Sequence, residues 1–232
     1  MCGRYGLTAE AEDFVEEFDL FSEPPSIQFP GLGGSRYDIR PMQRVPILRL
    51  HEGHPQIIAA RWGFTPSWAR KSGKKPAPIF NTRSEKLHSS SYWKRFLANR
   101  CLVPASFFYE WQEVGTPKTR PWMIKIKERS LFAFAGIYAH DTDPKTGEPI
   151  EVCSILTTDA NPLMRTIHNR GNNPFRQPVI LENGARLDWL SPEDPEGQNY
   201  NEAALLPLPE DRLDAIALSQ VGNDTDHTPP VL

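Results

Sequence analysis

The amino-acid sequence predicts a single α+β domain that consists mostly of β-strands, with short helices at its flanks. Seven short runs are rich in β-branched and aromatic residues, and turn signals such as DPKTGE (143–148) separate them. The 23 prolines suit many short strands and loops. No internal repeat and no linker between two cores interrupts the 232 residues, so we expect one domain over 1–232.

The predicted elements begin with an amphipathic helix over 9–21, capped by Thr8, whose apolar stripe holds Phe14, Phe18 and Phe21. A Pro/Gly-rich loop follows at 23–37. The expected strands are VPILRL (45–50), QIIAARWGF (56–64), RCLVPASFFYEW (100–111), PWMIKIK (121–127), LFAFAGIYAH (131–140), EVCSILTT (151–158) and PVIL (178–181).

Two short helices are expected between these strands, at 92–98 and at 161–168. In the second, Asn161 suits the N-cap and Pro162 the first helical position. Ser191 followed by Pro192 predicts a further helix start in the acidic segment near the end of the chain.

Composition excludes several classes of protein. A mean hydropathy of -0.50 and the lack of a long apolar run argue against a membrane span. The first twenty residues carry acids where a secretion signal is apolar, so we expect an intracellular, cytoplasmic protein. Three cysteines without a CxxC or HxxxH pair indicate a reduced protein, and we predict neither a metal nor another cofactor.

Charge is unevenly distributed along the chain, although the net charge is only -3. Residues 61–100 contain ten Lys and Arg against one acid, whereas 182–214 contain nine acids against two Arg. The first segment suits phosphates, or it is simply a solvated basic loop. The second segment we expect to pack as part of the same domain.

Cys2 stands directly behind the initiator Met1 in the opening MCGRY. Methionine aminopeptidases remove Met1 before a small residue, which would leave an α-amine with a pKa near ~8 beside a thiol with a pKa near ~8.5. Such an aminothiol can attack an amide carbonyl. It can also condense with an aldehyde to an imine that the thiol closes into a thiazolidine. An incidental cysteine at a frayed terminus is the alternative.

Three further side chains could take part in chemistry. Glu110 ends an apolar run between Tyr109 and Trp111, which would desolvate its carboxylate, or it is a surface acid at a strand end. His168 suits either acid/base chemistry or the capping of a short helix. Asn81 alone reads as a turn residue.

Five motifs in order carry a resemblance to a known family: MCGRY, RWGFTPSWA, IFNTRSE, FFYEWQ and TTDAN followed by IHNR. Together they resemble the SOS response-associated peptidase (SRAP) family over nearly the whole chain, from Cys2 to about 223. The resemblance implies a domain with a β-barrel-like core that protects abasic sites in single-stranded DNA. It also implies the means of protection, a covalent thiazolidine DNA–protein crosslink between the N-terminal cysteine and the deoxyribose aldehyde.

The resemblance also implies roles for site residues. Cys2 would be the nucleophile through both its amine and its thiol, and Asn81 would hold the amine or the sugar. Glu110 would move protons during ring opening and imine closure, and His168 would shuttle protons to the sugar hydroxyl or the leaving water. We expect a monomer that works on the nucleoid or chromatin in the response to DNA damage.

DNA contacts follow from the same resemblance. Arg4, Arg83 and Arg170 match positions that meet phosphates. Trp68, Trp111 and Pro41 would stack on or wedge between the bases beside the lesion. Trp62, in a predicted strand, is instead expected in the core.

The chain departs from the family pattern in three places. GNNPFRQ (171–177) intervenes where a proline usually follows the His-x-Arg segment, which would displace Arg170 and make Arg176 its alternative. Asp38 stands where an asparagine is usual, and an acid near DNA should weaken binding unless it caps a backbone group. The basic loop 71–78 either extends the DNA groove or is disordered.

Other functions remain open at this point. Cys2 could serve an N-terminal-nucleophile amidohydrolase, although the further motifs of glutamine amidotransferases are missing. The same thiol could serve a peptidase that cleaves its own Met1 or other proteins. A lyase-type activity or a non-covalent reader of modified DNA bases is a further possibility.

Overall fold

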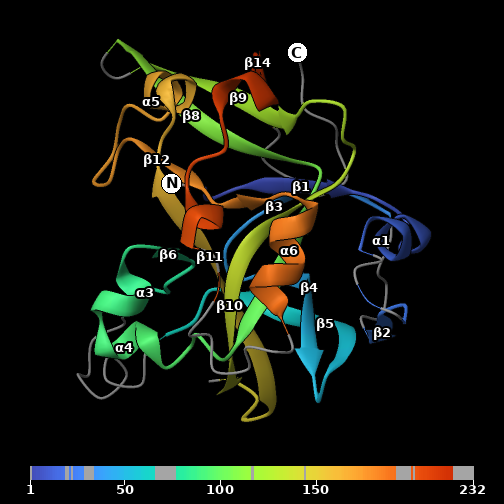
Figure 1. The fold of residues 1–232 in the computed structure, drawn as a ribbon. Helices are drawn as coiled ribbons and strands as arrows, with labels where there is room; N and C mark the ends of the chain where they lie inside the picture. Colours follow the sequence, from blue (N-terminus) through green and yellow to red (C-terminus); the bar gives the residue numbers. More distant parts are fainter. Residues whose placement is uncertain are drawn as a thin grey trace.

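The computed structural model describes residues 2–18, 21, 23–28, 34–65, 77–115, 118–143, 145–191, 200 and 202–221. Trp68 and most of the predicted basic loop lie outside these residues. The fold is mostly β, as the sequence predicts, with short helices around two sheets (Figure 1).

A closed five-stranded barrel forms the centre of the fold. Its strands are β4 (Arg44–His51), β5 (His54–Trp62), β7 (Arg100–Ala105), β10 (Phe132–Thr142) and β11 (Pro149–Asp159). In the order β11-β10-β7-β4-β5 each strand pairs antiparallel with the next, and a parallel pairing of β5 with β11 closes the ring. Closure leaves no free edge among these five strands.

Short strands extend the barrel sheet at several places. They are β2 (Ser26–Gln28) beside β5, β6 (Asn81–Arg83) and β12 (Arg176–Pro178) beside β11, and β13 (Ile180–Leu181) beside β10. The segment predicted as a continuous loop at 23–37 thus contains β2 and the first residues of β3 (Ser35–Ile39), because pairing with longer strands orders sequences with weak strand signals of their own.

A second sheet lies against the barrel in the order β14-β9-β8-β1-β3. Its other strands are β1 (Tyr5–Thr8), β8 (Phe107–Gly115), β9 (Lys118–Ile126) and β14 (Leu213–Ala217). The run predicted as one strand at 100–111 divides at Ser106, whose N–H donates to the carbonyl of Gly6 at 2.8 Å. The chain therefore passes from the barrel into the second sheet just before Glu110.

The helices are short: α1 (Ala11–Glu17), α3 (Lys86–Ser89), α4 (Ser91–Lys94), α5 (Pro162–Ile167), α6 (Asn183–Leu190), η1 (Glu202–Leu205) and η2 (Glu210–Arg212). α5 confirms the predicted cap, since Asn161 Oδ1 accepts from the Met164 N–H at 2.8 Å. The other two predicted helix starts fare differently. Thr8 ends β1, so α1 starts after Glu10 and the start at Thr8 is wrong. Ser191 directly follows α6, and residues 192–199, over which the second predicted helix would run, lie outside the described residues.

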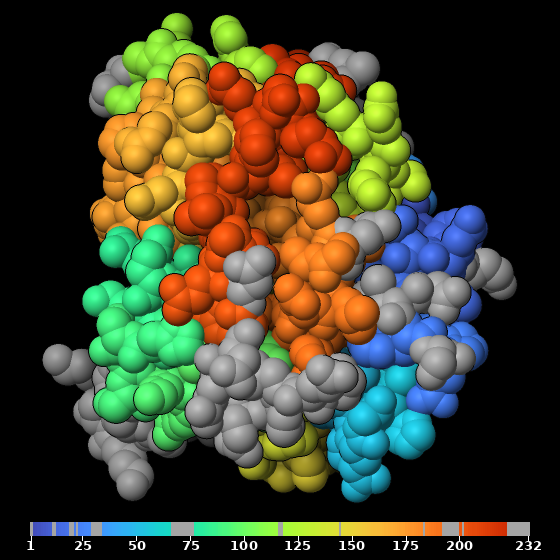
Figure 2. All heavy atoms as spheres, viewed as in Figure 1, coloured from blue at the N-terminus to red at the C-terminus, as the bar shows by residue number. Residues whose placement is uncertain are grey.

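One hydrophobic cluster links the barrel with the second sheet and the helices, and it includes the fully buried Trp62, as predicted. The described parts of the acidic segment belong to this packing: Trp189 of α6 is buried and its indole N–H donates to the carbonyl of Cys101 at 3.1 Å. In Figure 2 the segment from η1 to β14 covers the surface between α3 and α6.

None of the helices in the described part of the chain has the length and apolar character needed to cross a membrane.

Candidate functional site

Cys2 lies at the end of the second sheet and is fully buried. β1 pairs with β8 through Tyr5 opposite Phe108, and the Tyr109 N–H donates to the carbonyl of Arg4 at 2.9 Å. These bonds hold the start of the chain beside the stretch of β8 that carries Glu110. The thiol itself lies 3.9 Å from the carbonyl oxygen of Arg4.

Asn81 binds the main chain of Cys2 directly. Its Nδ2 donates to the Cys2 carbonyl at 2.7 Å. Parallel pairing of β6 with β11 fixes Asn81, and a hydrogen bond of 2.9 Å between Thr82 Oγ1 and Ser154 Oγ strengthens that pairing. Asn81 Oδ1 is buried and has no hydrogen-bond partner within the described residues, so this oxygen can accept a bond from a bound molecule.

Glu110 and His168 form a buried pair beside Cys2, with 4.0 Å between Glu110 Oε2 and His168 Nε2. His168 follows α5, and its main-chain N–H donates to the carbonyl of Met164 at 2.7 Å. The next residue fixes this helix end on β8, because the Asn169 side chain bonds both the N–H and the carbonyl of Glu113, at 2.8 and 3.2 Å. The acid and the imidazole thus meet through contacts between α5 and β8.

Burial controls the charge state of this site. It raises the pKa of the Cys2 thiol well above its usual range, and the negative charge of Glu110 raises it further. Burial also lowers the pKa of His168, against the opposing effect of Glu110. Near pH 7 the site therefore holds a neutral thiol and a neutral imidazole.

Arg4 is bound by Asp38 within the same region. Its Nε lies 2.6 Å from Asp38 Oδ1, and its guanidinium lies over the Trp111 ring, 5.4 Å from the centroid. Arg40 Nε bonds the other carboxylate oxygen of Asp38 at 3.0 Å. Burial alone would raise the pKa of Asp38, but the hydrogen bonds and charges of both arginines lower it. Two arginines therefore compensate the charge of Asp38, and the expectation that this acid weakens DNA binding stays a prediction.

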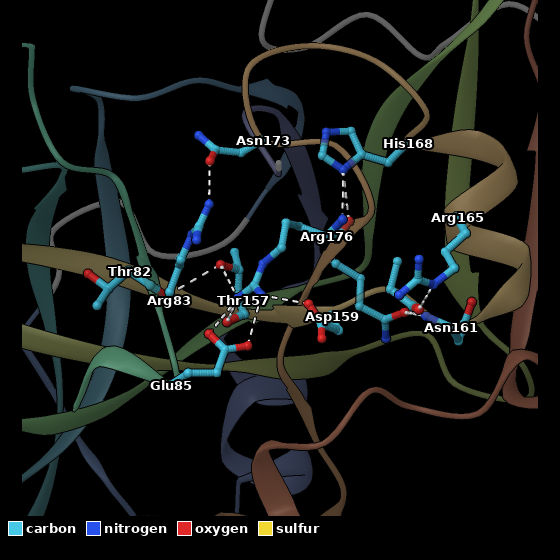
Figure 3. A network of polar contacts seen from close by, with 12 residues as sticks. Thr82, Arg83, Glu85, Thr157, Asp159, Asn161, Arg165, His168, Asn173 and Arg176 are labelled. Carbon is cyan, nitrogen blue, oxygen red and sulfur yellow. Dashed lines mark hydrogen bonds and ion pairs between the residues drawn. The ribbon is translucent and has the colours of Figure 1, made fainter. Parts of the chain in front are cut away.

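The remaining predicted DNA contacts take different positions. Arg83 and Arg170 are exposed, and the Arg83 guanidinium binds the side-chain oxygen of Asn173 (Figure 3). Pro41 is half-buried in the turn between β3 and β4, and Trp111 is half-buried on β8. Trp68 lies outside the described residues.

Arg176 does not present its charge to solvent. It is only 6% exposed, and its guanidinium binds Glu85 and Asp159 (Figure 3). The suggestion that it replaces Arg170 as a phosphate contact is therefore wrong. Sequence reasoning could not assign these partners, because Glu85 is 91 residues away along the chain.

The four predicted catalytic side chains thus come together from separate segments: Cys2, Asn81, Glu110 and His168. An amide that binds the main chain of Cys2, with an acid and an imidazole paired nearby, can hold a carbonyl compound and move protons at it. No group of three potential metal ligands occurs in the part of the chain that the structure describes.

Comparison with known proteins gives relatives along the whole chain. The chain is 33% identical over 234 residues to "Abasic site processing protein YoqW" of Bacillus subtilis, covering 100% of this chain and 98% of that protein. It is 31% identical to "Abasic site processing protein YoaM" of the same organism, covering 96% and 93%. "Abasic site processing protein YedK" of Escherichia coli is 24% identical, with 83% and 81% covered.

Solved structures share the fold. A protein from Bacteroides thetaiotaomicron superposes with a TM-score of 0.76 at 23% identity, covering 98% of this chain and 97% of the other. A protein from Bordetella bronchiseptica gives a TM-score of 0.70 at 26% identity, covering 94% and 100%. The family model of SOS response associated peptidase (SRAP) matches residues 1–224, and the chain belongs to this family.

Proposed function

We propose that this protein processes abasic sites in DNA, and that Cys2, once Met1 is removed, captures the sugar of an abasic site in single-stranded DNA as a thiazolidine. The observation that carries the proposal is that Asn81 binds the main chain of Cys2 while Glu110, which lies 4.0 Å from His168, acts on the Cys2 thiol. Relatives that cover the whole chain are named abasic site processing proteins, which supports DNA containing such sites as the partner.

The first step follows from the high pKa of the thiol. Because burial and Glu110 keep the thiol protonated, the α-amine attacks the open-chain aldehyde first. A C–N bond forms, and loss of the hydroxyl as water gives the imine. Glu110 or His168 takes the proton that the amine nitrogen loses and passes it to the leaving hydroxyl. Asn81 holds the carbonyl of Cys2, which orients the amine on the same residue.

The second step closes the ring. The sulfur adds to the imine carbon, the thiol proton passes to Glu110 or His168, and the imine nitrogen takes up a proton. Aldehyde and aminothiol are thereby converted to thiazolidine and one water. An imine at this carbon would promote β-elimination of the 3′ phosphate, whereas the saturated ring cannot accept those electrons. The strand therefore stays intact.

Arginines near the site would hold the strand. Arg83 and Arg170 are exposed, and Arg4 lies on Trp111 at the edge of β8. Cations near phosphates supply affinity without reading sequence, and aromatic faces stack on any base. Both properties suit a damage binder that acts on single strands as a monomer.

The proposal is tested with single-stranded DNA that contains one uracil and is treated with uracil glycosylase. The mature protein should form an adduct that survives heat and denaturant, and intact DNA should form none. Cys2→Ala should abolish the adduct. Cys2→Ser should also give no stable adduct, because a hydroxyl closes the ring less readily than a thiol. A heat-stable adduct at full yield with Cys2→Ala would refute capture by this residue.

A further inference from the structure

The main chain of Arg176 contacts the imidazole of His168 through both its carbonyl and its N–H. The carbonyl oxygen of Arg176 lies 2.9 Å from His168 Nδ1, and the N–H of Arg176 lies 3.1 Å from the same atom (Figure 3). Nδ1 therefore meets an acceptor and a donor at nearly equal distances. The other ring nitrogen, Nε2, faces Glu110.

This arrangement supports more than one protonation state of the ring. When Nδ1 carries a hydrogen, it donates to the carbonyl of Arg176, and Nε2 can accept a proton. When Nδ1 has none, it accepts from the N–H of Arg176, and Nε2 carries the hydrogen toward Glu110. The ring can thus exchange a proton at Nε2 while both tautomers keep a hydrogen bond at Nδ1.

The side chain of Arg176 fixes the main chain that makes these bonds. Its guanidinium nitrogens bond both carboxylate oxygens of Glu85 at 2.8 and 2.9 Å, Asp159 Oδ1 at 2.9 Å and the carbonyl of Thr157 at 2.6 Å. Burial alone would raise the pKa of Glu85, but the hydrogen bond and charge of Arg176 lower it, so the ion pair persists near pH 7.

The ion pair between Arg176 and Glu85 also connects the loop that holds His168 with the segment that carries Asn81. Glu85 follows β6, which carries Asn81, and the Ser84 N–H donates to the carbonyl of Thr157 at 2.9 Å. Arg176 bonds this same carbonyl of Thr157. The strand that binds Cys2 and the loop that holds His168 therefore share one anchor.

We propose that Arg176 is a positioning residue: anchored on Glu85 and Asp159, its main chain stabilises either tautomer of His168 and so enables the imidazole to move protons at the captured sugar. The inference deepens the proposed function and rests on it for the chemistry, whereas the contacts themselves are independent of DNA.

The charged groups around the ring define what a pH experiment reports. Glu110 faces it from β8, and Arg176 lies beside it on β12. The terminal amine and the Cys2 thiol are the other titratable groups here: the amine charge lowers the pKa of His168, and the thiol stays neutral near pH 7. A change at Arg176 should therefore act on His168 while the Glu110 carboxylate stays in place.

The direct test observes the ring by NMR. In protein labelled with ¹⁵N in its histidines, the imidazole nitrogen shifts distinguish the two neutral tautomers and the cation. Wild type should show His168 shifts averaged between the tautomers. Arg176→Met and Glu85→Gln should move these shifts toward one tautomer, and Arg176→Lys should lie between. The buried arginine Arg49, paired with Glu151 at 3.1 Å, gives the matched control Arg49→Met.

The functional arm measures adduct formation across pH 5–8. Arg176→Met should slow adduct formation about 10-fold, which is part of the ~10²–10⁴-fold that general acid–base groups contribute. It should also change how the rate depends on pH. Affinity for a strand with a reduced abasic sugar, which has no aldehyde, should stay unchanged. Arg49→Met should keep the wild-type rate and profile, which controls for the loss of a buried ion pair.

Unchanged His168 shifts in a folded Arg176→Met or Arg176→Lys variant would overturn the inference. So would a loss of affinity with an unchanged rate at saturation, since that would mark a phosphate contact. Failure of the proposed function has another sign: Cys2→Ala would still form the adduct, whatever the NMR arm shows.

Discussion

The three cysteines of this protein are equally buried, but they lie in very different surroundings. Cys2, Cys101 and Cys153 each have no exposed surface, and burial raises the thiol pKa of all three. Cys101 and Cys153 lie in the barrel, where their sulfurs belong to the hydrophobic core. Cys2 packs in the same core, yet Asn81 binds its main chain and the Glu110–His168 pair lies near it.

Exposure and thiol acidity therefore do not distinguish Cys2 from the two barrel cysteines. All three thiols are neutral near pH 7, so none stands out by its fraction of thiolate. Cys2 differs in that removal of Met1 would place an amine on the same residue, and in that Glu110 and His168 lie near it. Its reactivity would come from these neighbours and not from the sulfur alone.

Of these predictions, the largest effect is expected on the rate of adduct formation when a neighbour of Cys2 is changed. Glu110→Gln removes a proton-transfer group and should slow adduct formation at pH 7 by about 10²-fold, the low end for general acid–base catalysis. The control is Glu151→Gln, because Glu151 lies near Cys101 and pairs with Arg49. Single-turnover rates measure both. Equal rates for Glu110→Gln and wild type would remove Glu110 from the mechanism.

A change beside Cys101 should instead lower the stability of the fold and leave the rate of adduct formation nearly unchanged. A Cβ on Gly136 would lie 2.9 Å from Cys101 Sγ and 3.1 Å from Val103 Cγ2. Gly136→Ala should therefore destabilise the fold by about 1–3 kcal/mol through overpacking, with little effect on the adduct rate of the folded protein.

Urea unfolding measures this cost, and the double variant Gly136→Ala with Cys101→Ala is its control. Removing the sulfur makes room for the new methyl group, so the two changes together should cost less than their sum. Strict additivity would mean that the clash with Cys101 is not the cause.

The smallest expected effect is the pH dependence of the unfolding free energy that His168 contributes. The folded pKa of His168 is lowered, so the unfolded chain binds more protons as the pH falls below about 6.5. This contribution to stability is present above pH 6.5 and is lost as the pH falls toward the folded pKa. The carboxyls with lowered pKa in the described part of the chain, Asp38, Glu85 and Asp143, act only at lower pH, below their usual values near 4.

Unfolding free energies at pH 7 and pH 5.5 measure the effect. His168→Gln should reduce the difference between them, and His51→Gln, at an exposed position, should leave it as in wild type. No reduction in His168→Gln would contradict a neutral buried imidazole. The thiols of Cys101 and Cys153 do not titrate in this range.

Local sequence predicted the barrel strands well, because each is an apolar run of sufficient length, such as 45–50 or 131–140. It missed β1, β6 and β14, which are only three to five residues long and are ordered by pairing with β8, β11 and β9. Propensity cannot detect such strands, since their stability lies in the partner.

For the candidate site too, the sequence identified residues but not their arrangement in space. Family resemblance selected Cys2, Asn81, Glu110 and His168, but nothing local in the chain shows that they meet. Their proximity depends on β1 pairing with β8 and β6 with β11. Arg176 could not be placed, because its role depends on Glu85 and Asp159, which other strands bring to it.

The most direct test of covalent capture is to digest the purified adduct and locate the attached sugar by mass spectrometry. We expect it on the N-terminal peptide, with Met1 absent, and with the mass of the sugar fragment less one water. The sulfur of Cys2 should resist alkylation in that peptide after unfolding, while Cys101 and Cys153 react. A sugar attached to any other residue, or to a peptide that retains Met1, would contradict capture by Cys2.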